Sequence, residues 1–150
     1  MKKAVVTDKS PKAIGPYSQG VKIGDLVFVS GQIGNDPKTG EMVKGGINIQ
    51  TRQALKNLSE VLKAAGSGQE NVLKVTVYLT NMEDFPVMNG IYGKFFSEPY
   101  PARATVQVVR LPKDALIEIE CMAYKSSSHG DGEDSGCCGD CLPAGRQVVE

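Results

Sequence analysis

The chain has 150 residues, of which 17 are Lys or Arg and 17 are Asp or Glu, so its formal net charge at pH 7 is zero. Hydrophobic residues make up 41% of it, and no apolar run approaches the roughly 18 residues of a membrane-spanning helix. These figures exclude a membrane-spanning protein and a wholly disordered chain, and they favour one globular domain. No apolar stretch of about 7 to 15 residues follows the first lysines, so we predict no secretory signal and expect a cytoplasmic protein.

Charge and composition both change near residue 125. Residues 1–125 carry 16 basic and 12 acidic side chains, whereas residues 126–150 carry one and five. The small positive excess of the first part is not the dense positive field of a nucleic-acid-binding protein. Because Ser, Gly and Asp replace periodic apolar residues after residue 125, the sequence predicts one folded domain over residues 1–125 and a flexible tail over residues 126–150.

The tail contains the only histidine, His129, and three of the four cysteines, Cys137, Cys138 and Cys141. Four such side chains can bind zinc, but only Cys138 and Cys141 have CxxC spacing. Since an isolated match of this kind is usually incidental, we predict no metal site here.

Three groups of elements are predicted in chain order up to residue 80. Residues 21–23 and 26–30 flank a short Gly-Asp turn and form a predicted hairpin. Between Asn48 and Ala65 the apolar residues mostly recur three or four positions apart, and a glycine follows, which predicts an amphipathic helix. Residues 73–80 alternate between apolar and polar and predict a strand, whose apolar face would hold Leu73, Val75, Val77 and Leu79.

A second helix and two strands are predicted after residue 80. The helix runs from Asp84, its predicted N-cap, to Phe96, with Pro86 in the first turn. The strands span residues 104–109 and 116–125 and are separated by a turn. This order of elements predicts an α+β fold with a mixed sheet and both helices packed on one face.

The last strand indicates what covers the other face of the sheet. Its alternate residues can lie under the helices, which sends Glu118 and Glu120 to the opposite side together with Met122 and Tyr124. This mixture of apolar and charged groups predicts a face that another subunit partly covers. A solvated face with a few stray apolar residues is an equally weighted alternative.

The residue types available before residue 126 restrict the chemistry. With no histidine there, Ser-His-Asp and Cys-His catalysis are excluded from the folded domain. Glycine-rich phosphate-binding motifs and the carboxylate spacing of a metal loop are also absent. Cofactor-free chemistry remains, in a site built from Arg, Glu, Tyr, Ser, Asn and backbone groups around a small anionic substrate.

Five residues stand out as candidates on this basis. Arg103 opens a strand and can bind a carboxylate with its planar fork, although a solvent-facing arginine is the commoner case. Glu118, two residues before Glu120 on one strand face, can act as acid or base, or the pair can be two exposed glutamates on a wet face. Tyr17 follows a Gly-Pro turn and can donate to a ligand or pack in the core. Gly31 allows its backbone N–H to approach an anion, or it is an ordinary turn glycine.

Several segments together resemble one family, the RidA (YjgF) reactive-intermediate deaminases. The resemblance covers about residues 3 to 125, and its most specific block runs from Pro101 to Glu120. The segments that carry it are Ala13–Gln19, Ser30–Ile33, Asp36–Gly40, Ala64–Gly66, Asn89–Phe96, Pro101–Arg103, Leu111–Asp114 and Ile117–Glu120.

The resemblance implies a chorismate-mutase-like fold, a homotrimer with sites between subunits, and no cofactor. The implied activity is hydrolysis of enamine or imine intermediates, chiefly 2-iminopropanoate and 2-iminobutanoate, to 2-oxoacids and ammonia. Some relatives are described as ribonucleases or translation inhibitors, so an RNA-acting or chaperone-like protein is one alternative. A trimer that binds small carboxylates without turning them over is another.

The resemblance also implies a role for each site residue. Arg103 and the backbone N–H of Thr105 would bind the substrate carboxylate, and Glu118 would activate the attacking water. The rest of the pocket would be formed by Tyr17, Ser30, Gly31 and Asn89. Many bacterial relatives have cysteine at the position of Thr105, so this chain would lack any contribution from a thiol there.

Overall fold

The computed structural model describes residues 1–125. The predictions for the tail, including those for His129 and the three tail cysteines, lie outside the described residues. Within residues 1–125 no helix has both the length and the apolar character needed to cross a membrane. The helices and strands, in chain order, are β1 (Lys3–Val5), β2 (Gly20–Ile23), β3 (Leu26–Gln32), α1 (Ile47–Ala64), β4 (Val72–Leu79), α2 (Phe85–Phe95), β5 (Ala102–Gln107) and β6 (Ile117–Tyr124).

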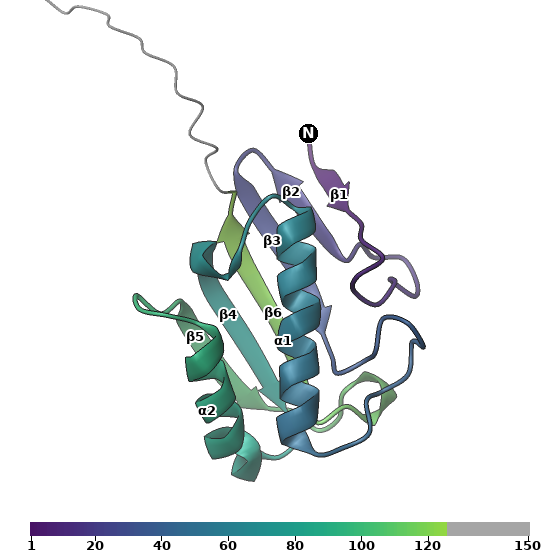
Figure 1. The fold of residues 1–150 in the computed structure, drawn as a ribbon, viewed down its shortest axis with the longest axis vertical. Coiled ribbons are helices and arrows are strands. Elements are labelled where there is room, and N and C mark those ends of the chain that lie inside the picture. Colours follow the sequence, from purple (N-terminus) through teal and green to yellow (C-terminus); the bar gives the residue numbers. More distant parts are fainter. Residues whose placement is uncertain (126–150) are drawn as a thin grey trace, which may run out of the picture.

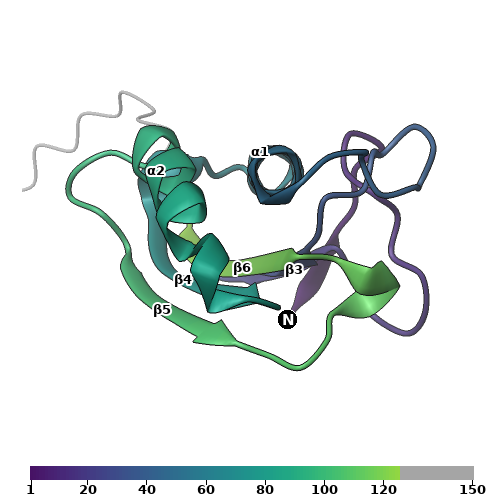
Figure 2. The same cartoon turned by 90° about the horizontal axis from the view of Figure 1, so that it is seen from below.

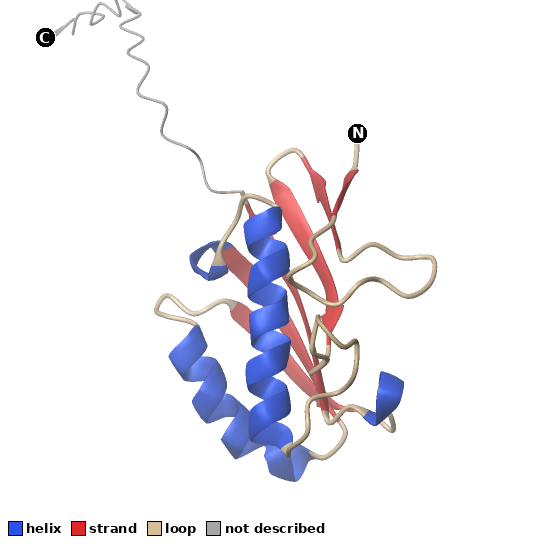
Figure 3. Ribbon diagram, turned by 45° about the vertical axis from the view of Figure 1, so that its right-hand side comes forward, coloured by secondary structure: helices blue, strands red, loops and turns tan. Residues whose placement is uncertain are grey.

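The strands form one mixed sheet in the order β1-β2-β3-β6-β4-β5 (Figure 1). The pair β4–β5 is parallel and every other pair is antiparallel. Helix α2 connects the two parallel strands, and both helices cover the same face of the sheet (Figures 2 and 3). The predicted α+β class, the mixed sheet and the placement of the helices are therefore confirmed.

Helix α1 forms because its apolar residues recur at helical spacing and bury a continuous stripe, in which Leu58, Val61 and Leu62 are completely inaccessible to solvent. It ends in a glycine cap, since Gly66 takes the left-handed φ of 80° that a side chain disfavours. The backbone N–H of Gly66 donates to the carbonyl of Lys63, and that of Ser67 donates to the carbonyl of Leu62. The predicted helix boundaries differ from the observed ones by one residue.

Two details of the prediction are wrong. Leu73 is half exposed because the β4–β6 register shifts between Val72 and Lys74, and Val72 takes the buried position instead. Strand β5 begins two residues earlier than predicted, which places Arg103 inside the strand. Asp84 is the N-cap residue of α2, as predicted, but its side chain makes no capping hydrogen bond; the chain enters α2 through a short 3-10 turn, Met82–Asp84, capped by the Asn81 side chain.

The sheet face away from the helices has the predicted mixed character. Ile117, Ile119 and alternate residues of the neighbouring strands fill the core under the helices. On the opposite side Glu118 and Glu120 are partly buried. Large apolar side chains on or beside that face remain exposed in the single chain, among them Leu26, Phe28, Met122 and Tyr124.

Candidate functional site

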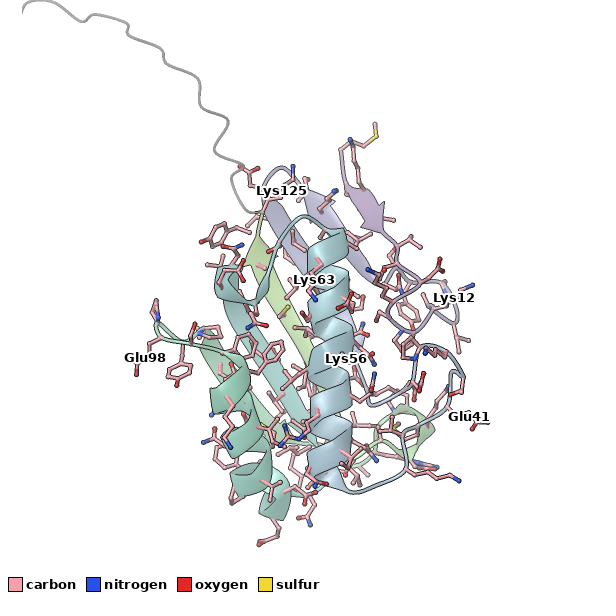
Figure 4. The ribbon with its side chains drawn as sticks, in the orientation of Figure 1. Lys12, Glu41, Lys56, Lys63, Glu98 and Lys125 are labelled. Atoms are coloured by element: carbon pink, nitrogen blue, oxygen red, sulfur yellow. The ribbon has the colours of Figure 1, made fainter. Side chains whose placement is uncertain are left out.

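A hollow of about 420 Å³ lies beside Glu118 of β6. Tyr17, Ser30 and Gly31 line it together with Glu118. Two lysines also line it: Lys12, from the loop between β1 and β2 (Figure 4), and Lys113, from the turn before β6. Four of the predicted site residues are therefore brought together from distant parts of the sequence.

A β-bulge in β3 shapes this hollow. Val29 pairs with Cys121 and Gln32 pairs with Ile119, so Ser30 and Gly31 together stand opposite a single residue of β6. A Cβ atom added at Gly31 would meet the Glu118 side chain, with the carboxyl carbon only 2.7 Å away. A side chain at position 31 would therefore displace the Glu118 carboxylate, which occupies the space that glycine leaves open.

The Glu118 carboxylate lies in an environment that favours its protonated form. Burial, and second the negative charge of Glu120, raise the pKa of Glu118 above the ordinary value of a glutamate. Within residues 1–125 this carboxylate accepts no hydrogen bond and forms no ion pair. A carboxylate of this kind is available to accept a proton from a bound water molecule.

The hydroxyls around the hollow have defined partners. The Ser30 hydroxyl donates to the Ser18 carbonyl at 2.6 Å, so its lone pairs face the remaining space as acceptors. The Tyr17 hydroxyl accepts a long hydrogen bond, 3.4 Å, from the Ile14 backbone N–H and remains free to donate. Lys113 donates to the Gly40 carbonyl at 2.8 Å, which joins the turn before β6 to the loop before α1.

Arg103 lies in a second hollow, of about 360 Å³, which Asn89, Tyr92, Tyr100 and Pro101 also line. Its guanidinium carbon is 4.5 Å from the centroid of the Tyr92 ring and 5.6 Å from that of Phe85. These cation–π contacts orient the guanidinium without neutralising it. Among the described residues no carboxylate pairs with Arg103.

Thr105 is two residues further along β5 and points to the same side as Arg103. Its partner in the β4–β5 register is the buried Val77, and that of Arg103 is the buried Val75. The Thr105 side-chain oxygen is buried without a hydrogen-bond partner in residues 1–125. Because β5 is the edge strand of the sheet in the described part of the chain, alternate backbone amides along it have no strand there to pair with.

The two candidate groups lie on opposite faces of the sheet. Glu118 alternates with the buried Ile117 and Ile119 and so faces away from the helices, whereas Arg103 pairs with the buried Val75 and contacts the Tyr92 ring of α2. A single chain therefore divides the predicted site residues into two groups and does not bring Arg103 and Glu118 to one substrate.

Sequence reasoning missed several residues of both hollows. Lys12 and Lys113 come from loops without a periodic pattern, and nothing in the sequence distinguishes Tyr92 from the other aromatic residues of α2. The sequence does place the aromatic residue Tyr92 in a predicted helix and Arg103 at the start of the next predicted strand. Only the fold shows that these two side chains are in contact. No group of three or more His, Cys, Asp or Glu side chains that could hold a metal occurs within residues 1–125.

Comparison with known proteins gives consistent matches over this domain. The family described as "Endoribonuclease L-PSP" matches residues 7–125. A RutC family protein of Pyrococcus horikoshii is 56% identical over 125 residues, which are 83% of this chain and 99% of that protein. The human protein named 2-iminobutanoate/2-iminopropanoate deaminase is 48% identical over 83% of this chain and 91% of its own length. The crystal structure of E. coli TdcF with bound serine superimposes with a TM-score of 0.78 at 44% identity, covering 83% of this chain and 99% of that one.

Proposed function

We propose that this chain, which belongs to the YjgF/RidA family, hydrolyses short 2-imino acids. The substrates are 2-iminopropanoate, 2-iminobutanoate and similar molecules, and the products are 2-oxoacids and ammonia. The observation that carries the proposal is a pair of complementary charged groups that line hollows and have no ion-pair partner within residues 1–125, the Arg103 guanidinium and the Glu118 carboxylate. The name of the human relative supports the reaction and the substrates. The serine in the E. coli relative supports a site for a small amino-acid-like molecule.

The proposal includes a homotrimer in which each site lies between two subunits. Because Arg103 and Glu118 are on opposite faces of the sheet, one protomer must provide the β5 side and its neighbour the Glu118 side. The exposed apolar residues Phe28 and Met122 and the open edge of β5 support contact between protomers at these surfaces.

In the proposed reaction, Arg103 holds the substrate carboxylate through two charge-assisted hydrogen bonds, helped by the backbone N–H of Thr105. Glu118 takes a proton from water as the water oxygen forms a bond to the imine carbon, and it passes this proton to the imine nitrogen, which gives a carbinolamine. Glu118 then takes the proton of the carbinolamine hydroxyl and passes it to the amino nitrogen as the C–N bond breaks, so that ammonia and the 2-oxoacid are released. Tyr17, Ser30, Gly31 and Asn89 complete the pocket, and the sequence of steps needs no cofactor. A positioned base of this kind contributes about 100- to 10,000-fold.

The test couples the chain to a serine or threonine dehydratase and follows 2-oxoacid release in the presence of a scavenger of free imine. We expect acceleration over the spontaneous rate, and a loss of about 100-fold or more in Arg103→Ala and in Glu118→Gln. Arg110→Ala is the matched control, since Arg110 is exposed and pairs with Asp114 outside both hollows. Wild-type protein that gives only the spontaneous rate would refute the proposal.

Binding without turnover is separated by the same variants. A protein that only binds small carboxylates would lose binding in Arg103→Ala, while wild type and Glu118→Gln would behave alike in the assay. RNA binding is the second candidate, because the matching family is described as an endoribonuclease. A filter-binding titration with single-stranded RNA at low and moderate salt tests it, because real phosphate contacts weaken steeply with salt.

A further inference from the structure

Glu120 occupies a different environment from Glu118 although both lie on the same face of β6. It lines a separate hollow of about 190 Å³ together with Phe28, Lys74 and Met122. The Tyr78 hydroxyl of β4 donates to the Glu120 carboxylate at 3.1 Å. Glu118 is the cross-strand partner of that same tyrosine in the β4–β6 register. Glu120 is therefore held in place, whereas Glu118 remains open to its own hollow.

Few charged side chains lie close to the carboxylates of Glu118 and Glu120. On β4, the titratable side chains that face the two glutamates are Lys74 and Tyr78. On β3, the facing residues are Phe28 and Ser30, and neither of them titrates. From the loops, Lys12, Tyr17 and Lys113 line the hollow of Glu118. Within residues 1–125 neither glutamate forms an ion pair, so the charge of Glu120 acts on Glu118 without a neutralising partner.

The effect of this arrangement on Glu118 has a definite sign. The Glu120 charge adds to burial in raising the pKa of Glu118. Burial, and second the hydrogen bond to Glu120, raise the pKa of Tyr78, so this phenol stays protonated at neutral pH and continues to donate to Glu120. A base with a raised pKa takes a proton from water more readily, provided that the pH is high enough to ionise it.

We propose that Glu120, fixed by the Tyr78 hydroxyl, is a positioning residue that acts through Glu118: it holds a negative charge two residues along the same face of β6 from the proposed base. The division of labour follows from geometry, since Glu118 faces the open hollow and Glu120 is engaged by the tyrosine. This inference rests on the proposed function for its catalytic consequence, but the coupling between the two carboxylates does not need substrate.

The experiment measures the titration of Glu118 in the assembled chain labelled with ¹³C at glutamate carboxyls, without substrate. In Glu120→Gln the Glu118 midpoint is expected to fall by about half a pH unit to one unit, the interaction of two charges roughly 7 Å apart at an effective dielectric constant of ~40 to ~80. Tyr78→Phe is expected to lower the Glu118 midpoint by a smaller amount. Glu120→Asp keeps the charge, so the Glu118 midpoint in this variant is expected to stay at the wild-type value. An unchanged midpoint in Glu120→Gln would overturn the inference.

The pH profile of imine hydrolysis supplies the second readout. In Glu120→Gln the acid limb of kcat/KM is expected to move to lower pH by the same amount, with a several-fold lower plateau because the base is weaker. A merely structural role of Glu120 would lower the rate equally at all pH values. If the titration shifts but wild-type protein shows no imine hydrolysis, the coupling stands and the proposed function fails. If hydrolysis is present and the titration does not shift, only the inference about Glu120 fails.

Discussion

Gly31 illustrates how one missing side chain shapes a reactive group. Its Cα faces the Glu118 side chain so closely that a methyl group there would displace the carboxylate. We therefore expect Gly31→Ala to lower kcat/KM by about 10- to 100-fold, because a displacement of about 1 Å in a positioned group costs up to this factor.

The matched control for Gly31→Ala is Gly46→Ala. Gly46 has a φ of −85°, and its added Cβ would come no closer than 3.8 Å to another group. Both variants are compared in the dehydratase-coupled assay after their melting temperatures have been measured. Full activity in Gly31→Ala would show that the carboxylate does not need the position it occupies.

Tyr92 is predicted to orient Arg103 through its ring alone. Its hydroxyl is buried without a hydrogen-bond partner in residues 1–125, and burial raises the pKa of Tyr92 to about 12. Tyr92→Phe should therefore keep the substrate KM and leave stability unchanged or improved. Tyr92→Leu removes a cation–π contact of about 0.5 to 2 kcal/mol and should raise KM several-fold with a smaller change in kcat. Equal KM values in the two variants would contradict this role of the ring.

At the scale of elements, the cap of α1 depends on backbone conformation rather than on side-chain contacts. Gly66 has a φ of 80°, and the helix ends there through one backbone hydrogen bond from Gly66 and one from Ser67. Gly66→Ala is expected to lower the free energy of unfolding by about 1 kcal/mol, because alanine strains at this φ. The reverse is expected for Gly90→Ala in α2, where nothing lies near the added Cβ and the stability should rise by about 0.5 to 1 kcal/mol. Urea unfolding at one protein concentration measures both, and the same sign in both variants would contradict the cap.

The elements that were predicted well are those whose signal is local. The apolar spacing of α1 and the short turn between β2 and β3 depend on residues close in sequence, so their boundaries were right to within one or two residues. The misplaced Leu73 and the early start of β5 depend on pairing with distant strands, because a bulge and a parallel register leave no mark on periodicity.

The same distinction applies to the candidate site. Arg103 and Glu118 were identified from the sequence, whereas the stacking of Tyr92 on Arg103 and the bond from Tyr78 to Glu120 join residues that only the fold brings together. The separation of Arg103 and Glu118 onto opposite faces was also not predictable from strand spacing. It depends on which strands pair across the whole sheet.

At the scale of the whole molecule, this separation leads to the sharpest prediction. If each site takes Arg103 from one protomer and Glu118 from its neighbour, two inactive variants can restore activity together. In mixed trimers of Arg103→Ala and Glu118→Gln, some interfaces contain an intact arginine and an intact glutamate from different chains. Random assembly of equal amounts gives about a quarter of the sites both groups, because each side of a closed ring is intact in about half of the protomers.

We therefore expect about a quarter of wild-type activity after co-expression or joint refolding of the two variants, and none after mixing the folded proteins without exchange of subunits. A trimer built from the double variant Arg103→Ala/Glu118→Gln and wild-type chains is the control, and it should retain a similar fraction through wild-type neighbours. If the two single variants stay inactive under conditions in which tagged protomers demonstrably exchange, the site does not lie between subunits. Arg103 and Glu118 would then act, if at all, on different molecules, since one chain holds them on opposite faces of its sheet.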